Sequence, residues 1–215
     1  MKRFKRLSSL QQLLFVFLLF IVSMLVCRIL YSGSLRYTFL LWNLFLAWIP
    51  FQLSLFLGRE NKAGKNIMLL LTWLLFFPNA LYIVTDLIHL EAPTNVPLWF
   101  DVLFLLTAAI TGLIMAFASL YKVEIFLAKT MSLQTVNRLV MAAIFLGSFG
   151  VYLGRFQRWN SWDVLSNPLV LFQEISLRFL FPFEHYRTWG ITFLLTTFFS
   201  LLYFGMKKMP AHNPQ

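Results

Sequence analysis

Four polar side chains recur along one otherwise apolar segment, residues 77–90 (FPNALYIVTDLIHL), and their types and spacing suit chemistry. Tyr82, Asp86 and His89 follow Asn79 by three, seven and ten residues. At about 100° per residue, the four side chains lie within roughly 80° of one another on a helix face. A polar face at membrane depth is costly unless it meets protein or water. The spacing therefore predicts a polar stripe that marks a functional site.

A second polar cluster covers residues 154–163 (GRFQRWNSWD). If this segment is helical, Arg155 and Arg158 each precede a tryptophan by four residues, close enough for a guanidinium to stack on an indole. Arginine offers a planar fork of donors that suits carboxylate or phosphate. The alternative is an interfacial belt, where Trp and Arg touch lipid headgroups without specificity. The predicted ligand-binding residues of both segments and the next span are Asn79, Tyr82, Asp101, Arg155, Arg158, Trp159, Asn160 and Asp163.

The candidate catalytic residues are Asp86 and His89, which have the chemistry of an acid–base pair. Asp86 has a second interpretation, in which it pairs with Arg155 or Arg158 and neutralises the buried charge. Asp86, His89 and Asp101 also form a conceivable three-ligand metal set, with Asp101 about ten residues past the stripe. Because no H-x-x-x-H or H-E-x-x-H pattern accompanies them, we predict no metal and no cofactor.

The elements that position these residues are membrane helices. Hydrophobic residues make up 60% of the chain and charged residues 12%, and the mean hydropathy is +0.75. This composition predicts an all-α, polytopic membrane protein with a single membrane domain over residues 1–215. The expected spans are residues 10–31, 35–57, 67–87, 98–121, 136–154 and 189–206. The net charge of +10 does not indicate nucleic acid binding, because no basic soluble module carries it.

The basic residues sort between alternate connections. One side carries twelve basic and two acidic residues, including all eight lysines, and the other carries six of each. The positive-inside rule therefore predicts that both termini are cytoplasmic. The N-terminal apolar run is too long for a signal-peptide core, so we expect a retained first span. Cys27 is the single cysteine, and no intramolecular disulfide is possible.

Residues 168–183 are apolar but too short for a standard span. Glu174 and Arg178 are four residues apart there, which suits an i,i+4 ion pair on an outer interfacial or re-entrant helix. If this segment crossed the membrane instead, the two C-terminal lysines Lys207 and Lys208 would be moved outside.

Three features concern helix contacts. Gly147, Gly150 and Gly154 share one face and predict a close approach by a neighbouring span. Pro78 predicts a kink, after which the chain resumes as a short half-helix. Asn43, in the middle of the second span, needs a partner, for which we expect a carbonyl freed by Pro50 or Pro78.

The motifs together resemble a known family. Four segments carry the resemblance: WNLFLAWIP (42–50), FPNALYIVTDLIHL (77–90), the Trp-Phe-Asp step at 99–101 and YLGRFQRWNSWD (152–163). Through these segments the chain resembles the DUF1361 family of uncharacterised bacterial multi-pass membrane proteins. One departure is Leu81, where similar sequences have Pro. The resemblance implies a bacterial cytoplasmic-membrane protein and brings no catalytic residues with it.

Three functions stay open. The first is an outward-facing pocket that binds or transports an anionic lipid headgroup or an envelope phosphate or sugar. The second is an enzyme that acts on a lipid-linked or envelope substrate through Asp86 and His89, with the arginines holding the anionic group. The third is a structural or accessory subunit, whose polar residues form a satisfied internal network. In each case the lipid bilayer is the expected partner.

Overall fold

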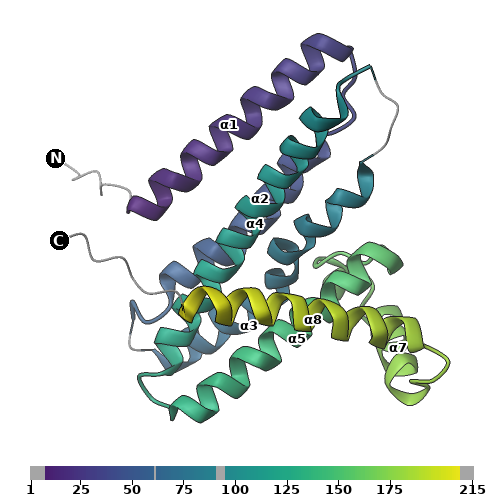
Figure 1. Ribbon diagram of the computed structural model, residues 1–215. Coiled ribbons are helices and arrows are strands. Elements are labelled where there is room, and N and C mark those ends of the chain that lie inside the picture. Colours follow the sequence, from purple (N-terminus) through teal and green to yellow (C-terminus); the bar gives the residue numbers. More distant parts are fainter. Residues whose placement is uncertain (1–7, 61, 91–94, 209–215) are drawn as a thin grey trace.

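The chain folds into helices joined by short connections (Figure 1). The computed structural model describes residues 8–60, 62–90 and 95–208, and these residues include no β-strand. The helices are α1 (Ser9–Ser32), α2 (Phe39–Phe56), α3 (Ala63–Tyr82), the 3-10 helix η1 (Ile83–His89), α4 (Leu98–Leu127), α5 (Leu133–Gln157), α6 (Asp163–Ser166), α7 (Pro168–Leu180) and α8 (Tyr186–Lys208). The predicted all-α class is confirmed.

Six of the described helical segments are long and apolar enough to cross a membrane. They are α1, α2, α3 with η1, α4, α5 and α8. The prediction of a multi-pass protein with six spans is therefore confirmed. The second span begins at Phe39 instead of residue 35, because Leu35 and Thr38 close a turn in which the Thr38 N–H donates to the Leu35 carbonyl.

The short apolar segment after α6 is a helix, as predicted, but α7 ends at Leu180 instead of residue 183. Arg178 Nη1 lies 2.5 Å from Glu174 Oε2, so the predicted i,i+4 ion pair is present. At 13 residues, α7 is too short to cross a bilayer as a helix.

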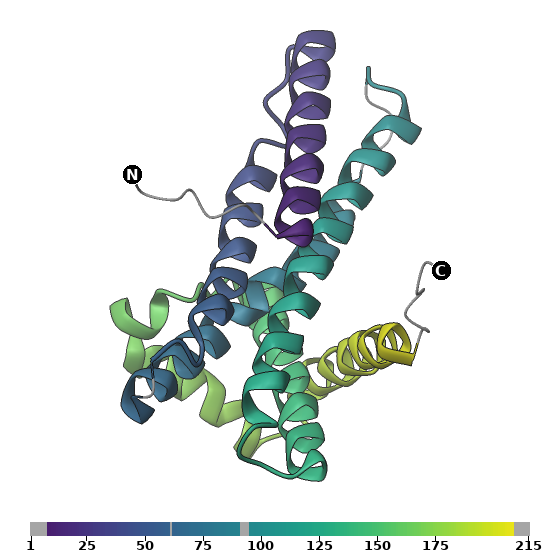
Figure 2. The ribbon, with the colours of Figure 1, turned by 90° about the vertical axis from the view of Figure 1, so that its left-hand side faces the viewer.

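Helix α4 lies at the centre of the arrangement and is the most buried of the six spans. It packs against α1, α2, α3 and η1, while α5 packs against α3 and α8. Figures 1 and 2 show α1 running beside α4. In Figure 1 the start of α1, the α4–α5 turn and the end of α8 lie on the left, and α7 lies on the right. The connections expected on the lysine-rich side therefore lie together, apart from α7.

The polar stripe crosses a change of helix type. Helix α3 continues through Pro78 to Tyr82, and the chain then tightens into η1 from Ile83. The short half-helix expected after Pro78 begins at Ile83, and it is a 3-10 helix. Because a 3-10 helix has three residues per turn, Asp86 and His89 lie on the same side, one above the other.

The three glycines of α5 face α3, which confirms the predicted close approach. A Cβ added to Gly150 would lie 2.5 Å from Pro78 Cγ, and one added to Gly147 would lie within about 3 Å of two α3 side chains. At Gly154 the nearest atom would be in the Tyr82 ring, 3.3 Å away. The absence of side chains here lets α5 bring its polar C-terminal end against α3 and η1.

Candidate functional site

Asp86 is the centre of a polar network that joins three spans. Its carboxylate is almost fully buried and forms an ion pair with Arg155 of α5. Asn43 Nδ2 of α2 donates to the other carboxylate oxygen at 2.8 Å. The expected partner of Asn43, a carbonyl freed by proline, is therefore wrong. A carboxylate is the stronger acceptor, and η1 brings it within reach.

Arg155 contacts three residues of the stripe and the neighbouring Thr85. Its Nε donates to Thr85 Oγ1 at 2.8 Å, and its Nη1 lies 3.0 Å from His89 Nε2. Its guanidinium carbon lies 4.0 Å from the centre of the Tyr82 ring. Because a guanidinium only donates hydrogen bonds, His89 Nε2 is the acceptor in this contact, and the ring proton belongs on Nδ1. The interpretation that Asp86 neutralises an arginine is confirmed for Arg155.

The expected stacking of the two arginines on tryptophans is wrong. Helix α5 ends at Gln157, and Arg158 takes a left-handed conformation with φ 60°. The chain therefore leaves the helix axis before either tryptophan, and Arg155 stacks on Tyr82 instead. Arg158 is exposed, and within the described ranges its side chain has no ion pair or hydrogen bond.

Asp163 closes a local turn instead of facing an arginine. Its Oδ2 accepts from the Asn160 backbone N–H at 2.6 Å, and its Oδ1 accepts from Ser166 Oγ at 3.1 Å. These bonds hold Asn160, Asp163 and Ser166 together at the start of α6.

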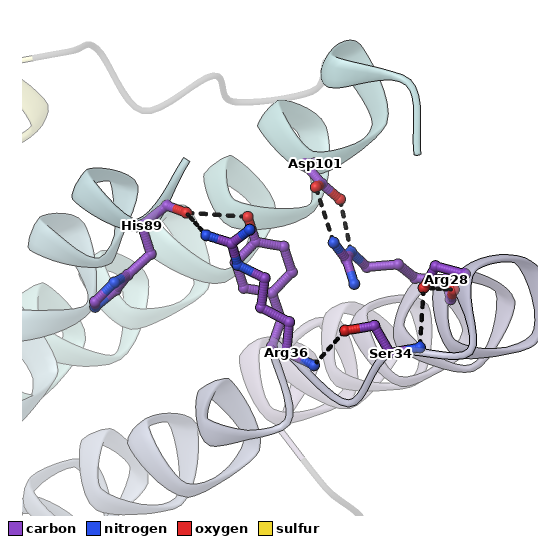
Figure 3. Close-up of polar contacts among 7 residues, drawn as sticks. Arg28, Ser34, Arg36, His89 and Asp101 are labelled. Carbon is purple, nitrogen blue, oxygen red and sulfur yellow. Dashed lines mark hydrogen bonds and ion pairs between the residues drawn. The ribbon is translucent and has the colours of Figure 1, made fainter. Parts of the chain in front are cut away.

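Asp101 is separate from the Asp86 network and pairs with Arg28 of α1 (Figure 3). Arg28 Nε and Nη2 lie 2.8 and 3.1 Å from the two carboxylate oxygens, and the two side chains are 2% and 0% exposed. The Arg28 guanidinium also lies over the Tyr37 ring at 4.4 Å. The expected approach of Asp101 to Asp86 and His89 is therefore wrong, because a buried arginine within a span requires a counter-ion.

The two ion pairs are connected through His89. Its ring contacts Arg155, and its backbone carbonyl accepts hydrogen bonds from Tyr37 Oη at 3.1 Å and from Arg36 Nη2 at 3.5 Å (Figure 3). Asp101 belongs to the Arg28 pair instead of the three-ligand set with Asp86 and His89 that was considered from the sequence. No group of three His, Cys, Asp or Glu side chains that could hold a metal occurs in the described parts of the chain.

Beside the Asp86 network lies a cleft of about 260 Å³ between α2, α3, α5 and the α6–α7 segment. Four of the predicted ligand-binding residues line it, namely Asn79, Tyr82, Trp159 and Asn160. Asn43, Trp42 and Ser161 add further polar or aromatic groups, and the remaining described lining is apolar apart from backbone. Neither catalytic candidate, Asp86 or His89, is among the described residues that line this cleft.

Ser161 fixes the connection after α5 against α3. Asn79 Nδ2 donates to Ser161 Oγ at 3.0 Å, and Ser161 Oγ donates to the Leu75 carbonyl at 3.2 Å. These bonds bring residues 159–161 over the cleft, although the loop is remote from α3 in sequence.

Sequence reasoning missed five residues of the two networks. They are Arg28, Tyr37, Thr85, Ser161 and Arg36, the last of which donates to the His89 carbonyl. Arg28 carried a usable signal, since a lone arginine within an apolar span predicts a carboxylate from another span. The hydroxyl residues carried none, because serine, threonine and tyrosine are common in membrane helices.

The chain belongs to the family described as "Protein of unknown function (DUF1361)", whose sequence model matches residues 42–202. The match begins within α2 and ends within α8, so it includes the cleft, Asp86 and Arg155, and excludes α1. No curated protein and no solved structure matches the chain.

Proposed function

We propose that this DUF1361 member binds the uncharged polar group of an amphipathic molecule in the cleft between α2, α3, α5 and the α6–α7 segment. The observation that carries the proposal is the chemistry of the lining. Amides, hydroxyls and aromatic rings line the cleft, and no Asp, Glu, Lys or Arg does so among the described residues. Pockets of this kind use a few placed polar groups to orient a ligand and apolar walls to bind it.

The charges next to the cleft support an uncharged ligand over an anionic one. Arg155 lies behind Tyr82 and is already neutralised by Asp86. Arg158 is exposed and is not among the described lining residues. An anion in the cleft would therefore be desolvated without a free cation to pair with. Asn43, Asn79 and Asn160, by contrast, can each donate and accept, as a hydroxyl-rich group such as a sugar requires.

The aromatic residues of the cleft complement such a group. Trp42, Tyr82 and Trp159 present broad apolar faces together with one polar edge each. A sugar ring likewise has apolar C–H faces and polar edges, so aromatic faces and amide groups can bind it at the same time. The polar part of the ligand is therefore best described as a neutral sugar or polyol headgroup.

Binding is better supported than turnover. A general acid or base has to lie within hydrogen-bond reach of the group it protonates or deprotonates. Asp86 is bonded to Arg155 and Asn43, and His89 is bonded to Arg155. In this arrangement the two side chains support the wall of the cleft, with Tyr82 and Asn43 between them and the ligand.

Native mass spectrometry of the purified protein tests the proposal through the lipids that it retains. We expect the wild-type protein to hold a neutral headgroup lipid and Asn79→Leu to retain at least about tenfold less. The variant loses a hydrogen bond to the ligand, which contributes about 1.4 kcal/mol, and also the Asn79–Ser161 bond that holds the loop over the cleft. Arg158→Ala is the matched control, because it removes a polar side chain outside the cleft, and it should retain the ligand.

Two outcomes would overturn the proposal. The first is the same bulk phospholipid in all three proteins. The second is loss of the ligand in Arg158→Ala with retention in Asn79→Leu, which would favour an anionic ligand at the exposed arginine. Thermal unfolding of each variant in detergent would verify that it is folded before retention is compared.

A further inference from the structure

We infer that the ligand of this cleft is a bilayer lipid that arrives sideways from the membrane and lays a hydrocarbon chain between α2 and α7. This inference rests on the proposed function and adds the source of the ligand and its path. Part of the cleft lining is apolar and comes from five helices: Leu46 on α2, Leu74 and Leu75 on α3, Leu153 on α5, Val164 on α6, and Leu171 and Ile175 on α7.

The polar and apolar lining of α2 and α3 is separated along the helix axes. On α2, Leu46 lies about one turn beyond Asn43, toward the α2–α3 connection. On α3, Leu75 lies about one turn before Asn79, again nearer that connection. The two helices are consecutive and pack against each other, so both leucines lie at the same end of the cleft. A lipid whose chain runs parallel to the spans would place its headgroup near Asn43 and Asn79 and its chain near Leu46 and Leu75.

Helix α7 forms a wall whose outer side is suited to lipid. Leu169, Phe172 and Leu180 are each at least 70% exposed, whereas Leu171 on the opposite side is buried. An exposed apolar face of this kind on a short helix is typical of a segment embedded at the membrane interface. The wall of the cleft is therefore surrounded by hydrocarbon rather than by water.

Helix α2 presents a matching surface on the other side of the opening. Trp42, Phe45 and Trp48 form a row in which successive ring centres lie 5.5 and 6.3 Å apart. All three rings are more than 40% exposed, and Trp42 also lines the cleft. A molecule that moves along this aromatic row from the bilayer would reach the cleft without crossing water.

Helix α7 is attached to the rest of the protein through the last turn and through the side that lines the cleft. The last turn is fixed because Trp189 Nε1 donates to the Arg178 carbonyl at 3.1 Å and the Trp189 ring meets Phe179 at 4.9 Å between centres. Leu171 and Ile175 lie before this anchor. Ile175 packs against a hydrophobic cluster on α5, so the cleft-lining side of α7 is a fixed wall along which a chain can lie.

Photo-crosslinking in phosphatidylcholine nanodiscs tests the inference. The probe is glucosyl-diacylglycerol with a diazirine in one acyl chain, compared with phosphatidylcholine that carries the same diazirine. We expect saturable labelling of α2 near Leu46 and of α7 near Leu171 and Ile175 by the glycolipid. Unlabelled glucosyl-diacylglycerol should compete with this labelling, and free glucose should not.

Two variants of α7 complete the experiment. Ile175→Trp narrows the apolar part of the cleft and should reduce the saturable labelling at least fivefold. Phe172→Trp adds similar bulk to the exposed side of α7 and should leave the labelling unchanged.

The outcomes separate the inference from the proposed function. Competition by free glucose, together with an Ile175→Trp variant that labels normally, would overturn lateral binding of a lipid while leaving headgroup binding in place. The inference and the proposed function would both be overturned by one result. In that result the labelling does not saturate, is equal for the two diazirine lipids and is unchanged in Asn79→Leu.

Discussion

Asp86 and Arg155 are 69 positions apart in the sequence, yet they form a buried ion pair that joins η1 to α5. The same carboxylate accepts from Asn43, so α2 is part of the same contact. Three spans thus meet at one charged residue, directly behind Tyr82 in the wall of the cleft. The pair therefore determines the shape of the cleft without belonging to its lining.

Removing the Asp86 charge should strongly destabilise the protein. Asp86→Asn leaves Arg155 buried without a counter-ion, which costs about 3–5 kcal/mol. We expect a clear fall in the midpoint of thermal unfolding in detergent. The double variant Asp86→Leu with Arg155→Met should recover most of the loss, because no charge is then buried. A loss in Asp86→Asn no larger than that of Glu60→Gln, which breaks an exposed pair worth less than about 1 kcal/mol, would contradict this account.

The Arg28–Asp101 pair should control how firmly α1 is attached to α4. Asp101→Asn is expected to raise backbone hydrogen–deuterium exchange in α1, with little change in α5. Arg28→Lys should have an intermediate effect, since lysine keeps the charge but loses the two-pronged contact with the carboxylate. Equal exchange in α1 for the wild type and both variants would show that apolar contacts alone hold this helix.

The approach of α5 to α3 predicts different effects for two glycine substitutions. Gly150→Ala places a Cβ 2.5 Å from the rigid Pro78 ring and should destabilise the protein by about 1–3 kcal/mol. Gly190→Ala on α8 has open space around the new methyl group and should be neutral or slightly stabilising. Thermal unfolding of the two variants side by side measures the difference, and equal midpoints would refute the close contact.

The distribution of lysines predicts that both termini are cytoplasmic. In a Cys27→Ser background, Glu184→Cys should react with a membrane-impermeant maleimide in right-side-out vesicles. Lys129→Cys should react only after the membrane is permeabilised. Both positions are exposed, so local burial does not account for a difference. The reverse labelling pattern would invert the topology and place the cleft near the cytoplasmic surface.

The spans were predictable because an apolar run of about 20 residues is a direct consequence of bilayer thickness. Three of the four stripe residues were predictable for a similar reason, since a helical repeat places Tyr82, Asp86 and His89 on one side. The contact of all three with Arg155 confirms that interpretation. The 3-10 geometry of η1 keeps Asp86 and His89 aligned, whereas Asn79 bonds to the connection after α5. The family resemblance is also confirmed, and it covers the whole of the cleft.

The pairing of the charges was not predictable from spacing. Asp101 is near the stripe in sequence, but its position on α4 directs it to Arg28 of α1. That choice depends on how the spans pack, which no local pattern encodes. The residue at which α5 ends was also not predictable. Arg158 occupies the left-handed position after the helix, where glycine is the usual residue. Without that signal, residues 158–163 resembled a continuation of the helix.

The Arg28–Asp101 pair also affects the order of events during synthesis. Arg28 is made 73 residues before its counter-ion, so α1 enters the membrane while its guanidinium is still unpaired. The position of Arg28 near the end of α1 reduces this difficulty, because a long side chain there can reach the headgroup region. Only after α4 is inserted can the arginine move inward and draw α1 onto it. The first helix to be translated is therefore expected to dock after α4 has been inserted.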